Sequence, residues 1–206
     1  RKRPERVFTL DEYVESRIIT QKQKDFLVKS ILNKKNILIV GGTSSGKTTF
    51  INGCINELSS TEDRVFLLED TPELQCSIQN SVFLTTTHHV SMKMLLQSSM
   101  RLNPDRIIVG ELRRGEETLE LLKAWNSGHA GGLSTIHAND CQSGLMKLEQ
   151  YLAEVVESDQ KKTILEAVDI VVNLIKNEEN KRVVREIKAL KDYDEKKKEY
   201  VLEEIA

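Results

Sequence analysis

One stretch limits what this chain can fold into more than any other. Residues 41–48 read Gly-Gly-Thr-Ser-Ser-Gly-Lys-Thr, and the apolar run Asn-Ile-Leu-Ile-Val stands directly before them at 36–40. Gly-x-x-x-x-Gly-Lys-[Ser/Thr] between a buried strand and a helix is the pattern of a phosphate-binding loop. The residues that follow, 49–58, have the character of a helix. The pattern therefore predicts a strand, a loop and a helix that together bind a nucleotide.

The chemistry of this loop follows from its residue types. Glycines let the backbone curl so that successive N–H groups face phosphate oxygens. Lys47 is expected to reach the β- and γ-phosphates, and the Thr48 hydroxyl is expected to bind Mg²⁺. The positive end of the following helix attracts the same anion. The predicted phosphate-binding residues are Gly41, Gly42, Thr43, Ser44, Ser45, Gly46, Lys47, Thr48 and Thr49.

Composition excludes several classes of protein. The 206 residues suit one ordinary domain, and a formal charge of −2 does not suggest direct nucleic-acid binding. The three cysteines lie far apart, which favours reduced, structural thiols in a cytoplasmic protein. No apolar run is long enough to predict a membrane-spanning helix. The chain opens Arg-Lys-Arg-Pro without a methionine, so we expect it to be part of something longer.

The rest of the chain alternates between strand and helix patterns. Capping boxes at 9–12 and 20–23 predict two helices before the first strand, the second with Phe26, Leu27, Ile31 and Leu32 on its apolar face. Buried strands are predicted at 64–68 and 106–111, a short strand at 82–84 and a strand running into a polar turn at 131–137. Helices are predicted at 91–101, 116–125, 145–156 and 163–167. Segments 170–175, 182–187 and 200–205 are β-rich, and the lysines at 196–198 suit a hairpin tip. The fold class is therefore α/β, a mostly parallel central sheet flanked by helices, with antiparallel C-terminal edge strands.

Two carboxylates stand where an open α/β sheet binds its ligand, at the carboxyl ends of strands. Glu111 ends one strand and is a candidate for holding Mg²⁺ and activating water, or else it caps the next helix. Glu69 ends another and could polarise water, or it is an exposed loop acid. His137 follows the strand at 131–136 and could contact the γ-phosphate, although a lone histidine is more often structural.

Four stretches together carry a family resemblance. In order, they are 41–49, Leu-Glu-Asp-Thr-Pro-Glu-Leu at 68–74, Arg-Leu-Asn-Pro-Asp-Arg-Ile-Ile-Val-Gly-Glu-Leu-Arg at 101–113, and Gly-Gly-Leu-Ser-Thr-Ile-His-Ala-Asn at 131–139. They resemble the Walker A, Asp, Walker B and His boxes of the traffic ATPases of bacterial type II and type IV secretion. Leu-Leu-Lys-Ala-Trp-Asn-Ser-Gly-His at 121–129 is similar to the conjugal-transfer branch, the TrbB-type ATPases.

The resemblance implies a RecA-like P-loop NTPase that assembles into a homohexamer, with Mg-ATP bound between neighbouring subunits. It implies a cytoplasmic enzyme docked peripherally on the inner-membrane components of a secretion system, where ATP hydrolysis drives pilus assembly or substrate translocation. By matching position, Glu111 is the Walker B acid and a metal ligand with Thr48, Glu69 the Asp-box acid and His137 the His-box residue. Arg113 and Arg101 match family arginines, and either could neutralise transition-state charge.

Two departures from the family pattern stand out. Ser44 occupies a loop position where the family commonly has glycine, so affinity or rate is expected to change. The family also has an N-terminal domain that closes over the nucleotide, and only its tail fits in this chain. We therefore predict a remnant or linker at 1–20, with Arg1, Arg3 or Arg6 left from that contact, and the ATPase domain at 21–206.

The predicted function is an Mg²⁺-dependent ATPase motor of a conjugative or related type IV secretion system. A type II secretion or pilus ATPase is the alternative within the superfamily. Outside it, the serine in the loop and the missing domain favour a hydrolytically weak, nucleotide-dependent scaffold. A DNA-translocating RecA-like motor has no aromatic or basic strip to support it.

Overall fold

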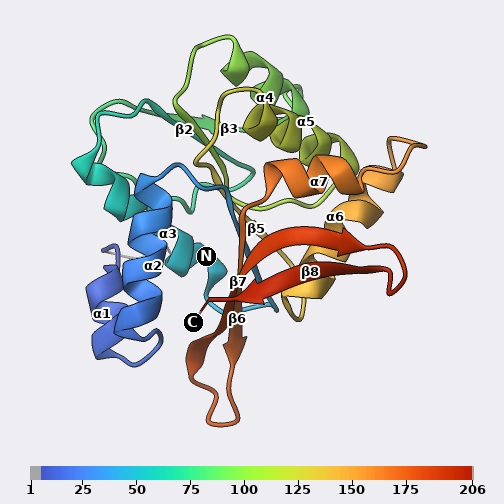
Figure 1. Cartoon of the computed structure of the whole chain (residues 1–206). Helices are drawn as coiled ribbons and strands as arrows, with labels where there is room; N and C mark the ends of the chain where they lie inside the picture. The colour runs from blue at the N-terminus through green and yellow to red at the C-terminus, as the bar shows by residue number, and fades with distance from the viewer. Residues whose placement is uncertain (1–5, 206) are drawn as a thin grey trace.

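The computed structural model describes residues 6–205 and contains one eight-stranded sheet (Figure 1). The strand order is β3-β2-β4-β5-β1-β6-β7-β8, parallel from β3 to β6 and antiparallel from β6 to β8. This confirms the predicted α/β class and its antiparallel C-terminal edge. The strands are β1 (Ile37–Gly41), β2 (Val65–Glu69), β3 (Ser81–Thr85), β4 (Arg106–Val109), β5 (Leu133–Ile136), β6 (Ile170–Lys176), β7 (Arg182–Asp194) and β8 (Glu199–Glu204).

Helices cover both faces of the sheet, because the buried strands are apolar on both sides. In β1, Ile37 and Ile39 belong to one core cluster, whereas Leu38 and Val40 belong to the other. The first three helices pack on one face and the last four on the opposite face (Figure 1). The helices are α1 (Leu10–Glu15), α2 (Gln21–Leu32), α3 (Lys47–Asn56), the 3₁₀ turn η1 (Glu57–Ser60), α4 (Met92–Met100), α5 (Gly115–Asn126), α6 (Cys141–Ala153) and α7 (Lys161–Ala167).

The N-terminal segment packs into the same core as the helix that follows the glycine-rich loop. Both predicted capping boxes are present, at Thr9 before α1 and at Thr20 before α2. Leu10 is buried, and the ring of Tyr13 meets Phe50 of α3 edge-on at 5.3 Å. Arg6 pairs with Glu12 at 2.8 Å, whereas Arg1 and Arg3 lie outside the described residues. The boundary at residue 20 remains a prediction.

Three predictions about local structure were wrong. Leu32 is 44% exposed, because the buried stripe of α2 runs through Leu27 and Ile31 and Leu32 lies off it. Helix α6 begins at Cys141 rather than 145, because Asp140 caps its first turn by accepting the Ser143 N–H at 2.7 Å. Strand β7 continues from 187 to Asp194, where its charged residues conceal the strand pattern.

The two ends of the parallel strands differ in character. At the amino ends, buried Asn36 accepts the N–H groups of Gly131 and Gly132 at 2.7 and 3.0 Å, and buried Arg106 bonds to surrounding carbonyls. At the carboxyl ends the glycine-rich loop, Glu69 and Glu111 surround a cavity. The buried polar contacts at the amino ends therefore join neighbouring segments of the fold, whereas the cavity lies at the carboxyl ends. Within residues 6–205, no helix has the length and apolar character that crossing a bilayer requires.

Candidate functional site

The sheet's carboxyl edge holds a cavity of about 470 Å³. Sequence motifs far apart in the chain meet in it: the loop after β1, the acidic segment after β2, the residues after β4 and the histidine after β5. Its lining residues are Thr43, Ser44, Ser45, Gly46, Lys47, Thr48, Thr49, Asn52, Glu69, Asp70, Thr71, Pro72, Glu73, Leu74, Gly110, Glu111, Arg113, His137 and Arg182. Most of the predicted site residues therefore line one cavity. Gly41 and Gly42 are not among the lining residues, although their carbonyls accept from Lys47, and Arg101 does not line the cavity either.

The loop has the geometry that phosphate binding requires. Gly46 is the N-cap of α3 at φ +101°, in the left-handed region, so the loop turns directly into the helix amino end. Lys47 is buried, and its ammonium donates to the carbonyls of Gly41 and Gly42 at 2.8 and 3.1 Å. The buried hydroxyl of Ser45 has no hydrogen-bond partner among the described residues. Since a buried polar atom is normally paired, this hydroxyl fits a loop built to receive polar ligand atoms.

The backbone at Ser44 has the conformation that favours glycine, the residue that the family resemblance led us to expect there. Its φ is +62°, in the left-handed region, which costs a residue with a β-carbon about 1–2 kcal/mol. The side chain is exposed on the rim of the cavity, so nothing in the core depends on it.

We expect Ser44→Gly to raise the thermal midpoint by about 1–3 °C, because glycine relieves the backbone strain at the cost of some extra unfolded-state entropy. Differential scanning calorimetry of the unliganded protein measures the effect. Ser44→Ala is the matched control, since alanine keeps the β-carbon and hence the strain. Equal midpoints for the glycine and alanine variants would show that strain at this position is not the cause.

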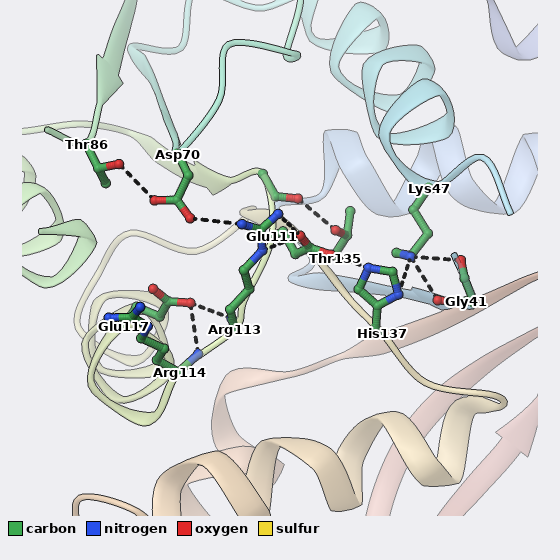
Figure 2. A network of polar contacts seen from close by, with 12 residues as sticks. Gly41, Lys47, Asp70, Thr86, Glu111, Arg113, Arg114, Glu117, Thr135 and His137 are labelled. Atoms are coloured by element: carbon green, nitrogen blue, oxygen red, sulfur yellow. Dashed lines mark hydrogen bonds and ion pairs between the residues drawn. The ribbon is translucent and has the colours of Figure 1, made fainter. Parts of the chain in front are cut away.

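A chain of polar contacts joins the loop to the strand ends (Figure 2). The Nδ1 atom of His137 lies 3.3 Å from the Lys47 ammonium, and its Nε2 lies 2.7 Å from a Glu111 oxygen. An ammonium can only donate, so Nδ1 must accept and the ring proton resides on Nε2, from which it is donated to Glu111. His137 thus connects Lys47 of the loop to Glu111 at the end of β4.

The same surroundings keep His137 neutral. Burial lowers the pKa of His137 below its usual 6.5, and the Lys47 ammonium lowers it further, while Glu111 acts in the opposite direction. Because the unfolded chain takes up this proton first, the contribution of His137 to stability falls as the pH drops below 6.5.

Replacing Lys47 with alanine is expected to raise the His137 pKa, because a nearby positive charge is removed while the Glu111 carboxylate stays. NMR titration of the imidazole carbon-bound protons gives the midpoint in both proteins. Lys93→Ala removes a lysine that pairs instead with Glu116, and it should leave the midpoint unchanged. A downward shift in Lys47→Ala would contradict the arrangement described.

Arg113 holds the other side of Glu111. Its Nε and terminal nitrogen lie 2.6 and 2.5 Å from one Glu111 oxygen, and it reaches Asp70 at 3.5 Å. The hydrogen bond to Glu111 raises the pKa of Arg113. Asp70 also accepts from the Thr86 hydroxyl at 2.9 Å. Arg113 therefore faces the Glu111 carboxylate of the same chain.

Glu69 and Glu117 shape the segments around the site. Glu69 is buried, and one of its oxygens accepts the N–H groups of Glu73 and Leu74, both at 2.8 Å. It therefore fixes the acidic segment that walls the cavity. Glu117 accepts the backbone N–H groups of Arg113 and Arg114, and burial raises its pKa. It sets the turn between β4 and α5 that carries Arg113.

The structure does not bring Arg101 to the site, because Arg101 is exposed at the end of α4 and does not line the cavity. Two other features of the site are not visible in the sequence pattern. The pairing of Asp70 with Thr86 has no sequence signal, although Asp70 belongs to the acidic stretch after β2. Arg182 lines the cavity from β7, and no motif marks it.

The donor set suits a hard divalent cation that also binds phosphate. The Thr48 hydroxyl and the Glu111 carboxylate line the same cavity. Mg²⁺ prefers oxygen ligands and is usually held by one or two protein groups together with substrate phosphates and water. The residues present therefore fit the predicted Mg²⁺.

Comparisons with known proteins agree with this geometry. A family model described as "Type II/IV secretion system protein" matches residues 1–201. The conjugal transfer protein TrbB of Rhizobium radiobacter is 46% identical over 195 residues, 94% of this chain and 60% of that protein. The type IV secretion system protein VirB11 of Bartonella quintana is 36% identical over 177 residues, 79% of this chain and 48% of that protein. The chain thus spans about three-fifths or less of the length of these relatives.

Solved structures show the same fold. The VirB11 ATPase of the Brucella suis type IV secretion system, in complex with sulphate, superposes with a TM-score of 0.74 at 24% identity, covering 91% of this chain and 59% of that one. The pilus retraction motor PilT with bound ADP superposes with a TM-score of 0.68 at 18% identity. This match covers 99% of this chain and 54% of the PilT chain. The RecA-like fold and the TrbB resemblance predicted from the sequence are confirmed. The chain belongs to the type II/IV secretion system protein family.

Proposed function

We propose that this chain is the ATP-hydrolysing part of a motor in a type IV secretion or conjugal transfer system. The observation that carries the proposal is the juxtaposition, in one cavity, of the buried Lys47 on the loop and the Glu111–His137 pair at the strand ends. A phosphate-binding loop facing a carboxylate that can orient water is the arrangement that nucleotide hydrolysis needs.

Each residue has a distinct role in the proposed reaction. The N–H groups of the loop and the Lys47 ammonium bind the phosphates and neutralise charge that develops on them. Glu111 orients and deprotonates the attacking water, and neutral His137 donates from Nε2 to keep that carboxylate in place. Arg113 and Arg101 are the candidates for neutralising transition-state charge, Arg101 from a neighbouring subunit. Mg²⁺, bound by Thr48 and Glu111, would supply further charge neutralisation at the phosphates.

The setting of the motor is proposed from its family and relatives. A homohexamer would complete each site at a subunit boundary, which suits the exposed Arg101. The partners would be inner-membrane components of the secretion system, with the motor in the cytoplasm and held peripherally at the membrane. Direct nucleic-acid binding is not expected, given the balanced charge of −2.

A second candidate is a nucleotide-dependent scaffold with weak hydrolysis. Two observations favour it: the strained backbone of Ser44, and the pairing of Glu111 with Arg113, which occupies the carboxylate. A type II secretion or pilus ATPase has the same chemistry and differs in its partners, so pulldown of type IV channel components distinguishes it.

Steady-state ATP hydrolysis measured against protein concentration tests the proposal, with Lys47→Ala as the blank. Activity that rises faster than linearly and is lost in the variant supports a motor whose sites are completed by neighbours. ATP binding without turnover at every concentration would instead support the scaffold.

A further inference from the structure

Arg182 lies against the phosphate-binding loop although it comes from the opposite end of the chain. Its Nε atom lies 3.5 Å from the Ser44 carbonyl oxygen. A β-carbon built on Gly46 would lie 2.9 Å from Arg182 Cδ, so the side-chain stem packs directly on the glycine that begins α3. Arg182 also lines the cavity with Lys47 and Thr48.

The backbone at the start of β7 is anchored, and the exposed side chain of Arg182 reaches the loop from there. Arg182 is the first residue of β7 and pairs with Lys176 of β6 in the antiparallel ladder. Two residues further on, buried Val184 donates its N–H to the Ile18 carbonyl at 2.9 Å. The start of β7 is thereby hydrogen-bonded both to β6 and to Ile18 of the N-terminal segment.

The charge of Arg182 is not used by the described part of the protein. Of the other two cavity cations, Arg113 pairs with Glu111 and Asp70, and the Lys47 ammonium bonds to loop carbonyls. Within residues 6–205, Arg182 makes no ion pair with a carboxylate, and its single hydrogen bond is the long one from Nε. Its remaining N–H groups are available beside a loop that presents backbone donors to an anion.

We propose that Arg182 is a nucleotide-binding residue that contacts the phosphate chain from the side of the loop opposite to Glu111. The sheet order places β4, with Glu111 after it, on one side of β1 and β7 on the other. Arg182 therefore binds phosphate oxygens shared by ATP and ADP and does not contact the attacking water. The proposal rests on the nucleotide site of the proposed function but does not require hydrolysis.

The test compares the binding of ADP and inorganic pyrophosphate to the whole chain. Displacement of a fluorescent ADP analogue gives both dissociation constants for the wild type, Arg182→Gln and Arg182→Lys. Losing one charge-assisted hydrogen bond at an exposed site is expected to weaken both ligands about tenfold in Arg182→Gln, with partial recovery in Arg182→Lys.

Lys181→Gln is the matched control, since it removes one positive charge from the adjacent exposed residue, which pairs with Glu179 at 2.6 Å and does not line the cavity. It should leave both constants within about twofold, because an exposed ion pair contributes little.

Three results would overturn the proposal. Weaker ADP binding with unchanged pyrophosphate binding would place Arg182 on the nucleoside rather than the phosphates. A lower thermal midpoint without ligand, with both affinities unchanged, would make Arg182 a support for the loop only. An equal loss of affinity for both ligands in Lys181→Gln would show that the effect comes from the overall positive charge and not from a contact made by Arg182. If the wild type binds ADP but never hydrolyses ATP, the proposed motor function is wrong. The comparison of ADP and pyrophosphate affinities still tests the role of Arg182 in that case.

Discussion

Glu111→Gln is expected to lower kcat for ATP hydrolysis by about 10²–10⁴-fold, the range that a general base typically contributes. The amide cannot take a proton from water, and it no longer carries the charge that Arg113 and His137 face at 2.5 and 2.7 Å. The loop residues that would bind the phosphates are unchanged, so the dissociation constant for ATP should change far less than kcat. Single-turnover hydrolysis and nucleotide titration separate the two effects.

Glu116→Gln is the matched control for this prediction. Glu116 lies near Glu111 in the chain, but its carboxylate pairs with Lys93 at 3.0 Å and does not line the cavity. Its replacement should leave kcat unchanged. A Glu111→Gln variant with kcat within about threefold of the wild type would remove Glu111 from the chemistry, since a base contributes far more than that.

The site is predictable from sequence wherever a strand pattern and a polar residue are adjacent in the chain. Residues 36–40 and 106–109 read as buried strands, and parallel strands place their carboxyl ends at one edge. The loop, Glu69, Glu111 and His137 can therefore be assigned to a common site from the amino-acid sequence alone, and loop residues 43–49 line the cavity together with Glu69, Glu111 and His137. The capping boxes at Thr9 and Thr20 are equally local, and both are present.

Residues that reach the site from a distance leave no such pattern. Arg182 contacts Ser44 across 138 positions, and its role depends on where the β6–β7 hairpin folds back. The contact between Asp70 and Thr86 depends on the loop between β2 and β3 in the same way. Side-chain pairing among charged residues follows tertiary geometry, which neither periodicity nor capping signals encode.

Arg106 is the extreme case of this limitation, because the sequence shows only a charged residue at the start of a strand. In the structure it is 1% exposed, and its guanidinium bonds to Asp63 at 2.5 Å and to the carbonyls of Ile31 and Gly131 at 2.8 and 3.1 Å. It joins the end of α2, the start of β4 and the start of β5. Burial alone would raise the pKa of Asp63, but the hydrogen bond and charge of Arg106, with Lys34, outweigh it and lower that pKa.

Arg106→Leu is expected to lower the free energy of unfolding by about 3–5 kcal/mol, because it leaves a partly buried carboxylate and two carbonyls without their donor. Urea denaturation measures the loss as a lower midpoint with an unchanged m-value. Arg106→Lys keeps the positive charge but lacks the several N–H donors of the guanidinium, so its free energy of unfolding should lie between those of the wild type and Arg106→Leu. This variant tests the prediction even if Arg106→Leu does not fold.

Lys34→Gln is the matched control for Arg106. Lys34 is 45% exposed and pairs with the same Asp63 at 3.3 Å, so losing it should cost less than about 1 kcal/mol. The pH dependence gives an independent check. The lowered pKa of Asp63 stabilises the wild type above 3.8, and this contribution is lost as the pH falls through the folded-state pKa. The difference between wild type and Arg106→Leu should therefore shrink in acid, and a constant difference would show that Asp63 is not the group that Arg106 stabilises.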